Sequence, residues 1–336
     1  MLNGTSQLTD LSKIERGLTE FFSGVYGEDV AVGGVEEVSA GWEAKIIGFY
    51  LSAEGGERPM IARVFSGATA SEKVEREFGL MLRLLRVGYP VPEVYAYSSS
   101  PEFLGEPFLA MERLRGSLLD HFTENTRQGR KSLSVFSQLY VGLHSLPARR
   151  ILCATYGYRT TRGRLRHRIA DVSRGLNDES QLAGIGEWLS KNLLNIQNTS
   201  LALIHQDFHP GNVMFKADRT PVVIDWSGAD LGDPREDLGW TKLLASTFLS
   251  SELGDAVLSG YEEASGRRVE GLAYFEVLAG FRRLADATAM FRGESSGLRR
   301  EVADIMRGNR AHYLRIIERL GELTGLETWR LADILE

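Results

Sequence analysis

A strongly polar stretch near the middle of the chain stands between two short apolar runs. The text LIHQDFHPGNVMF, from Leu203 to Phe215, passes from apolar residues through two histidines, an aspartate and an asparagine and back again. A second run, PVVID, ends at Asp225 and is separated from NVMFK only by the polar link ADRT. Short apolar runs joined in this way predict a small β-hairpin with polar loops at its ends.

Three oxygen-bearing side chains flank the predicted hairpin. Asn212 follows Asp207 by five residues, and Asp225 follows Asp207 by 18. Mg²⁺ prefers oxygen ligands and is usually held by one or two carboxylates together with substrate phosphates, so we predict Asn212 and Asp225 as metal ligands. A phosphoryl acceptor also needs its hydroxyl aligned and its proton accepted. We predict that Asp207 does this, so the catalytic set is Asp207, Asn212 and Asp225.

Two other interpretations of this stretch are weaker. Asp and Asn often close turns through their side chains, but turn formation does not predict the second carboxylate, Asp225, after an apolar strand. His205 and His209 have the i, i+4 spacing of zinc ligands on a helix. Pro210 and the glycine after it make a helix there impossible, and we expect His205 to support the loop by hydrogen bonds to the backbone or to Asp225.

The rest of the chain predicts an α+β protein with two lobes. The first 110 residues contain β-rich runs such as AKIIGFYL and PMIARVF, and a helical pattern starts at Ser71 and ends at Gly88. Helical patterns dominate later segments, for example YFEVLAGFRRLADATAMF. We predict a small lobe with an antiparallel sheet over residues 1–112. A larger, mostly helical lobe over residues 113–336 carries the catalytic loop, the metal site and the acceptor site.

Composition excludes several classes of protein. The net charge of −6 and the pI near 5.7 give no general attraction to nucleic acid or to an anionic membrane. No apolar run approaches the roughly 18 residues of a membrane span, and the N-terminus lacks the layout of a secretory signal. Cys153 is the single cysteine, which excludes an intramolecular disulfide or a cysteine-rich metal site. We expect a soluble cytoplasmic protein.

The polar stretch resembles the catalytic and metal-binding loops of the protein-kinase-like superfamily. The sequence HQDFHPGNVMF followed by VVIDWSGADLGDPREDLGW is most similar to the aminoglycoside phosphotransferase and choline kinase branch. In that branch a G-x-P-x-x-D-L run follows the hairpin aspartate, and Gly232, Pro234, Asp237 and Leu238 match it in order. The resemblance implies a two-lobed kinase-like fold, ATP or GTP with Mg²⁺, and transfer of the γ-phosphoryl group to a hydroxyl of a small molecule. For Asp237 itself we favour a structural role at the start of the helix near Pro234.

The resemblance extends to the N-terminal lobe. PMIARVF is similar to the strand that carries the phosphate-binding base, with Arg63 where most kinases have lysine; arginine can still bind two phosphate oxygens. Glu77 is then its helical partner, with Glu75 as the alternative, although such a pair is often an ordinary surface contact. The remaining nucleotide-binding candidates are Ser39 and Gly41 in the covering loop SAGWEAK, and the backbone of Glu112 and Leu114 at the adenine edge.

The acceptor stays open at this stage. An aminoglycoside, which would imply antibiotic resistance, needs converging carboxylates, and the candidates are Asp230, Glu262, Glu263 and Asp286. A metabolic kinase would act on choline, homoserine, methylthioribose or a sugar, while a pseudokinase is disfavoured because the three catalytic residues are present.

Seven arginines and no acid lie between Arg149 and Arg168. They form either a solvated face or a site for a phosphate or carboxylate of the acceptor. Trp226 and Trp240 are expected in the core, and oligomeric state and nucleotide preference are undetermined.

Overall fold

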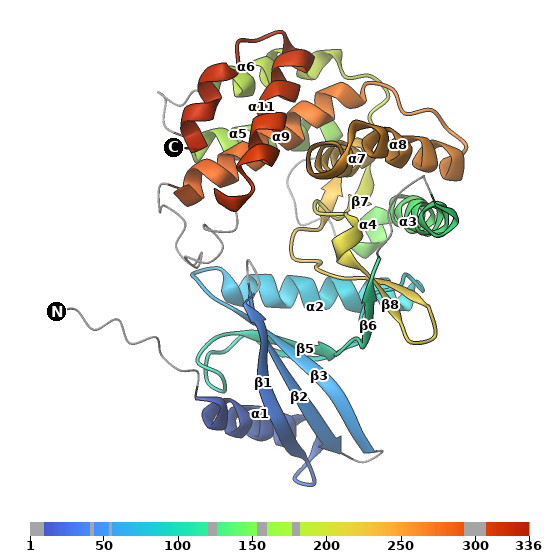
Figure 1. Cartoon of the computed structure of the whole chain (residues 1–336). Coiled ribbons are helices and arrows are strands. Elements are labelled where there is room, and N and C mark those ends of the chain that lie inside the picture. Colours follow the sequence, from blue (N-terminus) through green and yellow to red (C-terminus); the bar gives the residue numbers. More distant parts are fainter. Residues whose placement is uncertain are drawn as a thin grey trace, which may run out of the picture. The chain divides into compact units, whose positions relative to one another are not determined.

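The structure is a computed structural model that describes residues 10–40, 44–53, 56–119, 126–152, 160–176, 182–291 and 307–335. The chain divides into two compact units, Met1–Arg115 and Gly116–Glu336 (Figure 1). No helix in the described ranges is long and apolar enough to cross a membrane. Gly41 lies outside these ranges, as does the side chain of Ser39.

A five-stranded antiparallel sheet with strand order β1-β2-β3-β5-β4 forms the first unit. Its strands and helices are α1 (Leu11–Tyr26), β1 (Ala31–Ala40), β2 (Ala44–Ala53), β3 (Gly56–Phe65), α2 (Ala70–Arg86), β4 (Val94–Ser98) and β5 (Phe108–Glu112). The sheet and the helix predicted from Ser71 are therefore present. The first helix, α1, was not predicted from the sequence.

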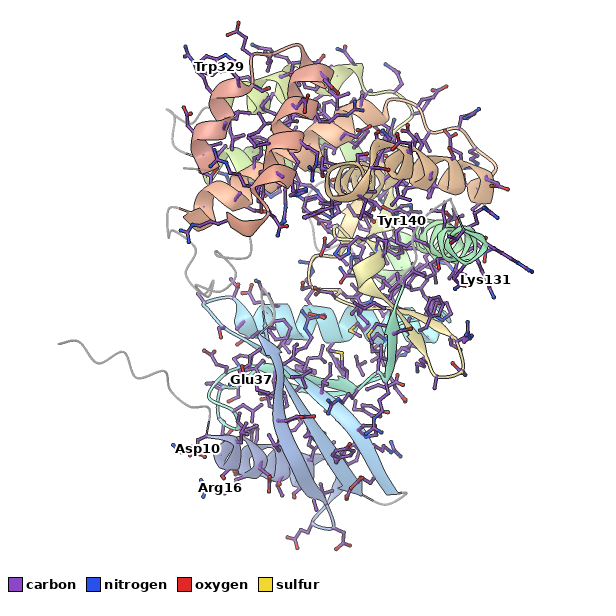
Figure 2. The ribbon with its side chains drawn as sticks, in the orientation of Figure 1. Asp10, Arg16, Glu37, Lys131, Tyr140 and Trp329 are labelled. Atoms are coloured by element: carbon purple, nitrogen blue, oxygen red, sulfur yellow. The ribbon has the colours of Figure 1, made fainter. Side chains whose placement is uncertain are left out.

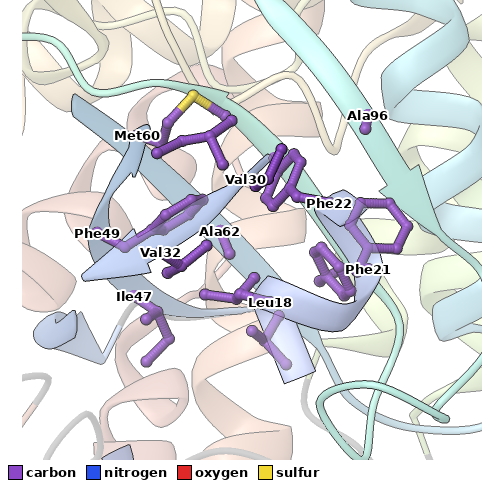
Figure 3. Packing of buried hydrophobic residues seen from close by; sticks show 14 residues of the cluster. Leu18, Phe21, Phe22, Val30, Val32, Ile47, Phe49, Met60, Ala62 and Ala96 are labelled. Atoms are coloured by element: carbon purple, nitrogen blue, oxygen red, sulfur yellow. The ribbon is translucent and has the colours of Figure 1, made fainter. Parts of the chain in front are cut away.

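Helix α1 supplies much of the core of the first unit. Asp10 accepts a hydrogen bond from the backbone N–H of Lys13 at 3.3 Å and so caps the helix. Leu18 and Phe22 of this helix are fully buried against strand residues such as Phe49 (Figure 3). The rings of Phe22 and Phe49 are 5.8 Å apart. Alternate residues of β2 and β3 point to this core, which leaves the intervening positions for the opposite face.

The second unit is mainly helical. Its elements are β6 (Gly116–Leu118), α3 (Arg127–His144), α4 (Ala148–Ile151), α5 (Thr161–Arg174), α6 (Ala183–Asn192), η1 (Leu193–Asn195), β7 (Ala202–Ile204), η2 (Pro210–Asn212), β8 (Val213–Lys216), β9 (Pro221–Val223), β10 (Asp230–Gly232), α7 (Pro234–Leu244), η3 (Ala245–Leu249), α8 (Ser251–Ser265), α9 (Leu272–Phe291), α11 (Arg310–Thr324) and η4 (Trp329–Leu335). The predicted hairpin is β8 with β9, and β6 adds a third strand to it. The predicted α+β fold class is confirmed.

Helices α7 and α9 pack unusually closely at Gly239. A Cβ atom added there would lie 2.5 Å from the carbonyl carbon and 2.6 Å from the carbonyl oxygen of Phe275. These are backbone atoms of α9, which cannot rotate away as a side-chain tip could. The close approach holds α7 in place, and α7 in turn carries side chains that contact the predicted catalytic loop.

We predict that Gly239→Ala destabilises the protein by about 1–3 kcal/mol, because the new methyl group forces the two helices apart. Gly184→Ala in α6 is the matched control, since a Cβ atom there meets nothing within 4 Å. Replacing a helical glycine by alanine in open space should stabilise by about 0.5–1 kcal/mol. Urea unfolding measures both values, and equal stability of the two variants would contradict the close packing.

His312 of α11 gives the fold a pH dependence. Its ring is almost fully buried and stacks on Phe248 with centroids 3.6 Å apart, and neither ring nitrogen has a hydrogen-bond partner within the described ranges. Burial, together with the charges of Arg283 and Arg315, lowers the pKa of His312 to about 3. The folded protein therefore excludes a proton that the unfolded chain binds near pH 6.5.

We predict that stability falls as the pH drops below 6.5, by about 1.4 kcal/mol from this residue at pH 5.5. His312→Phe removes the titrating group and keeps a ring on Phe248. The variant should therefore lose about 1.4 kcal/mol less than the wild type between pH 7.5 and 5.5. Urea unfolding at both pH values measures the difference, and identical pH dependence of the two proteins would refute the assignment.

Candidate active site

A buried carboxylate fixes the start of the loop that follows β7. Asp237 of α7 is fully buried, and its two oxygens accept hydrogen bonds from the backbone N–H groups of His205, at 2.7 Å, and Gln206, at 2.6 Å. Gln206 has a φ of 68°, a left-handed conformation that is uncommon outside glycine. The carboxylate therefore satisfies two backbone donors at the point where the chain turns sharply out of the strand.

A histidine from another helix contacts this carboxylate, and a tyrosine from a third helix supports the histidine. His144 of α3 places Nε2 at 3.2 Å from Asp237 Oδ2, and its Nδ1 lies 3.0 Å from the hydroxyl of Tyr261 in α8. Asp237 lies in the first turn of α7 and has a structural role, as predicted, but it does not cap the helix. The residue that caps α7 is Asp233, in a capping box with Glu236. Asp237 lies in the same first turn and faces the loop.

His205 supports the loop through a hydrogen bond to the backbone, as predicted. Its ring is completely buried, and Nε2 lies 3.0 Å from the carbonyl oxygen of Ile224. The ring also packs edge-on against Trp226, with centroids 4.6 Å apart. Burial lowers the pKa of His205, although nearby carboxylates oppose this. The neutral imidazole thereby ties the loop to the residue that follows the second strand of the hairpin, so its partner is the backbone.

Phe208 anchors the middle of the loop in the core. It stacks on Tyr140 of α3 with ring centroids 4.2 Å apart, and its carbonyl oxygen accepts a hydrogen bond from the hydroxyl of Thr241 in α7. Figure 2 labels Tyr140 together with Lys131 on the same helix; the lysine points away into solvent, whereas Tyr140 is fully buried. Burial of Phe208 turns its neighbour Asp207 to the opposite side.

Asp207 combines firm hydrogen bonding with exposure. Oδ1 accepts a hydrogen bond from the indole N–H of Trp240 at 2.9 Å, and Oδ2 accepts one from the amide of Asn212 at 3.1 Å. The side chain is nevertheless 43% exposed. Burial alone would raise its pKa, but the hydrogen bond and charge of His209, helped by His205 and Trp240, hold the pKa of Asp207 below its usual range. The group is an oriented, ionised carboxylate that can accept a proton.

The hairpin register places Asn212 and Asp225 close together. Val213 pairs with Val223, and the N–H of Ile224 donates to the carbonyl oxygen of Asn212 at 2.9 Å. Asp225 is the next residue and has a φ of 65°, a conformation that non-glycine residues seldom adopt. Such outliers cluster at functional sites.

The donor set at this end of the hairpin fits a hard cation. The amide nitrogen of Asn212 donates to both the carbonyl and a carboxylate oxygen of Asp207, at 2.8 and 3.1 Å. Its amide oxygen is therefore the atom left to bind a metal. The carboxylate of Asp225, which accepts a hydrogen bond from Ser227 at 3.3 Å, is the second donor. One amide and one carboxylate are a suitable partial shell for Mg²⁺.

In the first unit, Arg63 pairs with Glu77. Nη1 of Arg63 lies 2.6 Å from Oε1 of Glu77, and the side chains are only 10% and 2% exposed. The pair is thus buried and is not a surface contact. Glu75, the alternative partner, is exposed to solvent. A buried arginine held by a carboxylate keeps its charge and a fixed direction.

The other predicted nucleotide-binding residues lie at the edges of the first unit. Ser39 is next to the last residue of β1, and Gly41 falls outside the described residues. Glu112 ends β5, and its N–H donates to the carbonyl oxygen of Glu93 at 2.8 Å, so this donor is already used. Leu114 is partly buried in the short link between β5 and β6.

Sequence reasoning missed the contact between Trp240 and Asp207. Trp240 is buried, as expected, yet its indole N–H serves the predicted catalytic residue. A signal was available, because Asp237 and Trp240 are three residues apart on one helix and therefore share a face. Once Asp237 is assigned to the loop, Trp240 must approach the same loop.

The carboxylates suggested for a cationic acceptor are largely engaged. Asp230 lies 3.1 Å from Arg168 and 3.7 Å from Arg164. Glu262 lies 2.6 Å from Arg268 and also accepts the N–H of Val269. Both of these acids are therefore paired with arginines of the same unit.

Comparisons with known proteins identify the family of the chain. A family model described as "Phosphotransferase enzyme family" matches residues 34–281. A curated relative, acyl-CoA dehydrogenase family member 11 of Pongo abelii, is 28% identical over 245 residues, which are 68% of this chain and 30% of the relative. The chain thus spans less than a third of the length of that relative.

Two solved structures share the fold. One is a putative aminoglycoside phosphotransferase from Ralstonia eutropha, with a TM-score of 0.62, 20% identity, and coverage of 94% of this chain and 97% of that one. The other is choline kinase LicA from Streptococcus pneumoniae, with a TM-score of 0.61, 14% identity, and coverage of 91% and 98%. These likenesses confirm the predicted kinase-like fold. Because the family model covers most of the chain, this protein belongs to the phosphotransferase enzyme family.

Proposed function

We propose that the protein transfers the γ-phosphoryl group of ATP or GTP to a hydroxyl of a small molecule. One observation carries the proposal. Asp207 is an ionised, partly exposed carboxylate, oriented by Trp240 and Asn212, and Asn212 is bonded to the residue before Asp225. A base for the acceptor and two donors for a cation therefore lie at one end of one hairpin. Phosphoryl transfer needs this combination of positioning and charge neutralisation.

The geometry supports a proposed role for each residue of the site. Asp207 aligns the acceptor hydroxyl and takes its proton as the bond from the acceptor oxygen to the γ-phosphorus forms. The bond from the γ-phosphorus to the bridging oxygen breaks, and the nucleoside diphosphate leaves with that oxygen. Asn212 and Asp225 would hold Mg²⁺, which supplies neutralisation of the phosphate charge when bound.

Nucleotide binding is proposed for the N-terminal residues 1–112, and catalysis, metal binding and acceptor binding for residues 113–336. Arg63, oriented by Glu77, would bind the phosphates through its forked guanidinium. Ser39 and Gly41 would cover them, and Glu112 and Leu114 would border the base. Similar solved proteins support a nucleotide, because LicA has been solved with AMP and an aminoglycoside phosphotransferase with ADP and hygromycin B.

The candidate functions differ in the class of molecule that accepts the phosphoryl group. An aminoglycoside phosphotransferase acts on a polycation, and a metabolic kinase acts on choline, homoserine, methylthioribose or a sugar. A pseudokinase would bind nucleotide without turnover. A coupled ADP-release screen over aminoglycosides, amino alcohols, hydroxy acids and sugars separates these cases. We propose a cytoplasmic enzyme that uses neither nucleic acid nor a membrane as partner.

We predict that Asp207→Asn lowers kcat by about 10²–10⁴-fold, because the amide cannot accept the acceptor proton. Nucleotide affinity, measured with a fluorescent ATP analogue, should change less than about twofold because Asp207 is assigned to the acceptor. Asp218→Asn, in the exposed turn of the same hairpin, is the control and should keep wild-type activity. Wild-type turnover of Asp207→Asn would exclude this role.

We predict that Asp225→Asn raises the Mg²⁺ concentration for half-maximal activity by about tenfold or more, since a full negative charge leaves the metal shell. The measurement is a Mg²⁺ titration at fixed ATP. A parallel titration of nucleotide binding with and without Mg²⁺ locates the defect in metal binding. An unchanged midpoint for both activity and binding would remove Asp225 from the metal site.

A further inference from the structure

Three arginines from two helices of the second unit lie beside α7. Arg164 and Arg168 belong to α5, and Arg282 belongs to α9. Two carboxylates face them, Asp230 at the start of β10 and Glu236 in the first turn of α7. These five side chains comprise three cations and two anions, and Asp286 and Asp237 add negative charge near Arg282.

Arg168 is fixed by contacts within the protein. Its Nε lies 3.0 Å from Glu236, and its Nη2 lies 3.1 Å from Asp230 and 3.0 Å from the carbonyl oxygen of Leu231. The side chain is only 11% exposed. Arg164 lies 3.7 Å from the same carboxylate of Asp230. Both acids of the group are thus occupied by the arginines of α5.

Arg282 has no such partner in the described ranges. No carboxylate of those residues lies within ion-pair distance of it, and its guanidinium lies over the ring of Trp240, whose centroid is 5.2 Å from Cζ. The side chain is partly exposed. Burial and the charge of Arg168 lower the pKa of Arg282, against the weaker influence of Asp286, Glu236 and Asp237. A partly buried cation beside a second cation is stabilised when an anion binds between them and solvent.

Trp240 links Arg282 to Asp207. The indole that lies beneath the guanidinium donates its N–H to Asp207 Oδ1 at 2.9 Å. One aromatic side chain therefore separates an incompletely neutralised arginine from the proposed base. A ligand that reaches both residues must carry a hydroxyl at one end and a group that arginine binds at the other.

We propose that Arg282 binds a carboxylate or phosphate group of the acceptor while the acceptor hydroxyl lies at Asp207, so that the substrate class is an anionic alcohol. This inference rests on the proposed phosphotransferase function. Arginine binds both anions through paired N–H donors. A polycationic acceptor is disfavoured at this position because Arg282 and Arg168 would repel it and the nearby carboxylates Asp230 and Glu236 are already paired.

The test is a set of acceptors that differ only at the end remote from the hydroxyl. We would measure ADP release with ω-hydroxycarboxylates of two to eight carbons, with ω-hydroxyalkyl phosphates, with neutral diols and with ω-amino alcohols of the same lengths. The proposal expects turnover of the anionic series, with the best length set by the span of Trp240. The carboxylate and phosphate series decide which anion is preferred.

Arg282→Gln tests the residue itself. For the anionic acceptors KM should rise about 10- to 100-fold with kcat within about threefold, which is the loss expected for a hydrogen-bonded charge pair. Arg282→Lys should recover part of the affinity. Neutral diols should have the same kinetic constants in wild type and variant. Arg283→Gln, on the next residue of α9 and over the ring of Tyr313, is the matched control for charge.

The outcomes separate this inference from the proposed function. Preference for amino alcohols, failure of every anionic compound to support turnover, or equal effects of Arg282→Gln on anionic and neutral acceptors would each overturn the anion site. If ADP release still depends on Asp207 in those cases, the phosphotransferase assignment stands alone. ATP consumption that is indifferent to Asp207→Asn would overturn both.

Discussion

The hydrogen bonds from the carboxylate of Asp237 to the backbone of His205 and Gln206 are the contacts on which the candidate site depends. Two adjacent N–H groups at the end of β7 cannot bond a strand once the chain turns, and buried donors without partners are costly. The buried carboxylate of Asp237 accepts a hydrogen bond from each of these two N–H groups. With the loop held there, Phe208 enters the core and Asp207 faces outward. His144 and Tyr261 extend the same support to α3 and α8.

The parts of the site that sequence predicts are those built from near neighbours. Asp207, Asn212 and Asp225 could be grouped because a hairpin needs only a few residues on each side, and its register then fixes the spacing. Trp240 and Asp237 reach the loop from 30 or more residues away, through the packing of α7 on α9. Local pattern carries no information on that packing. For the same reason α1 and the added strand β6 were not foreseen, although each contributes to its unit.

The charges around the candidate site likewise follow from the structure and not from the composition. The net charge of −6 indicates nothing about the surroundings of the proposed base. The arginine-rich segment before Arg168 gave two interpretations, a solvated face or an anion site. In the structure Arg164 and Arg168 are largely buried and neutralise Asp230 and Glu236, so they act as internal partners. Their effect on binding is indirect. By pairing with both acids they leave Arg282, on another helix, without a carboxylate at ion-pair distance in the described ranges, although the charges of Asp286, Glu236 and Asp237 still act on it.

The backbone before and after the hairpin in sequence stores strain that the surrounding bonds offset. Gln206 and Asp225 have φ values of 68° and 65°, each of which costs about 1 kcal/mol or more for a residue with a Cβ atom. The N–H of Gln206 is held by Asp237, and the carbonyl before Asp225 is held by His205. Because these contacts are made by the protein alone, Asp207 and Asp225 are oriented before any ligand arrives. A reaction that depends on positioning and charge benefits from this, since binding energy is then not used to order the loop.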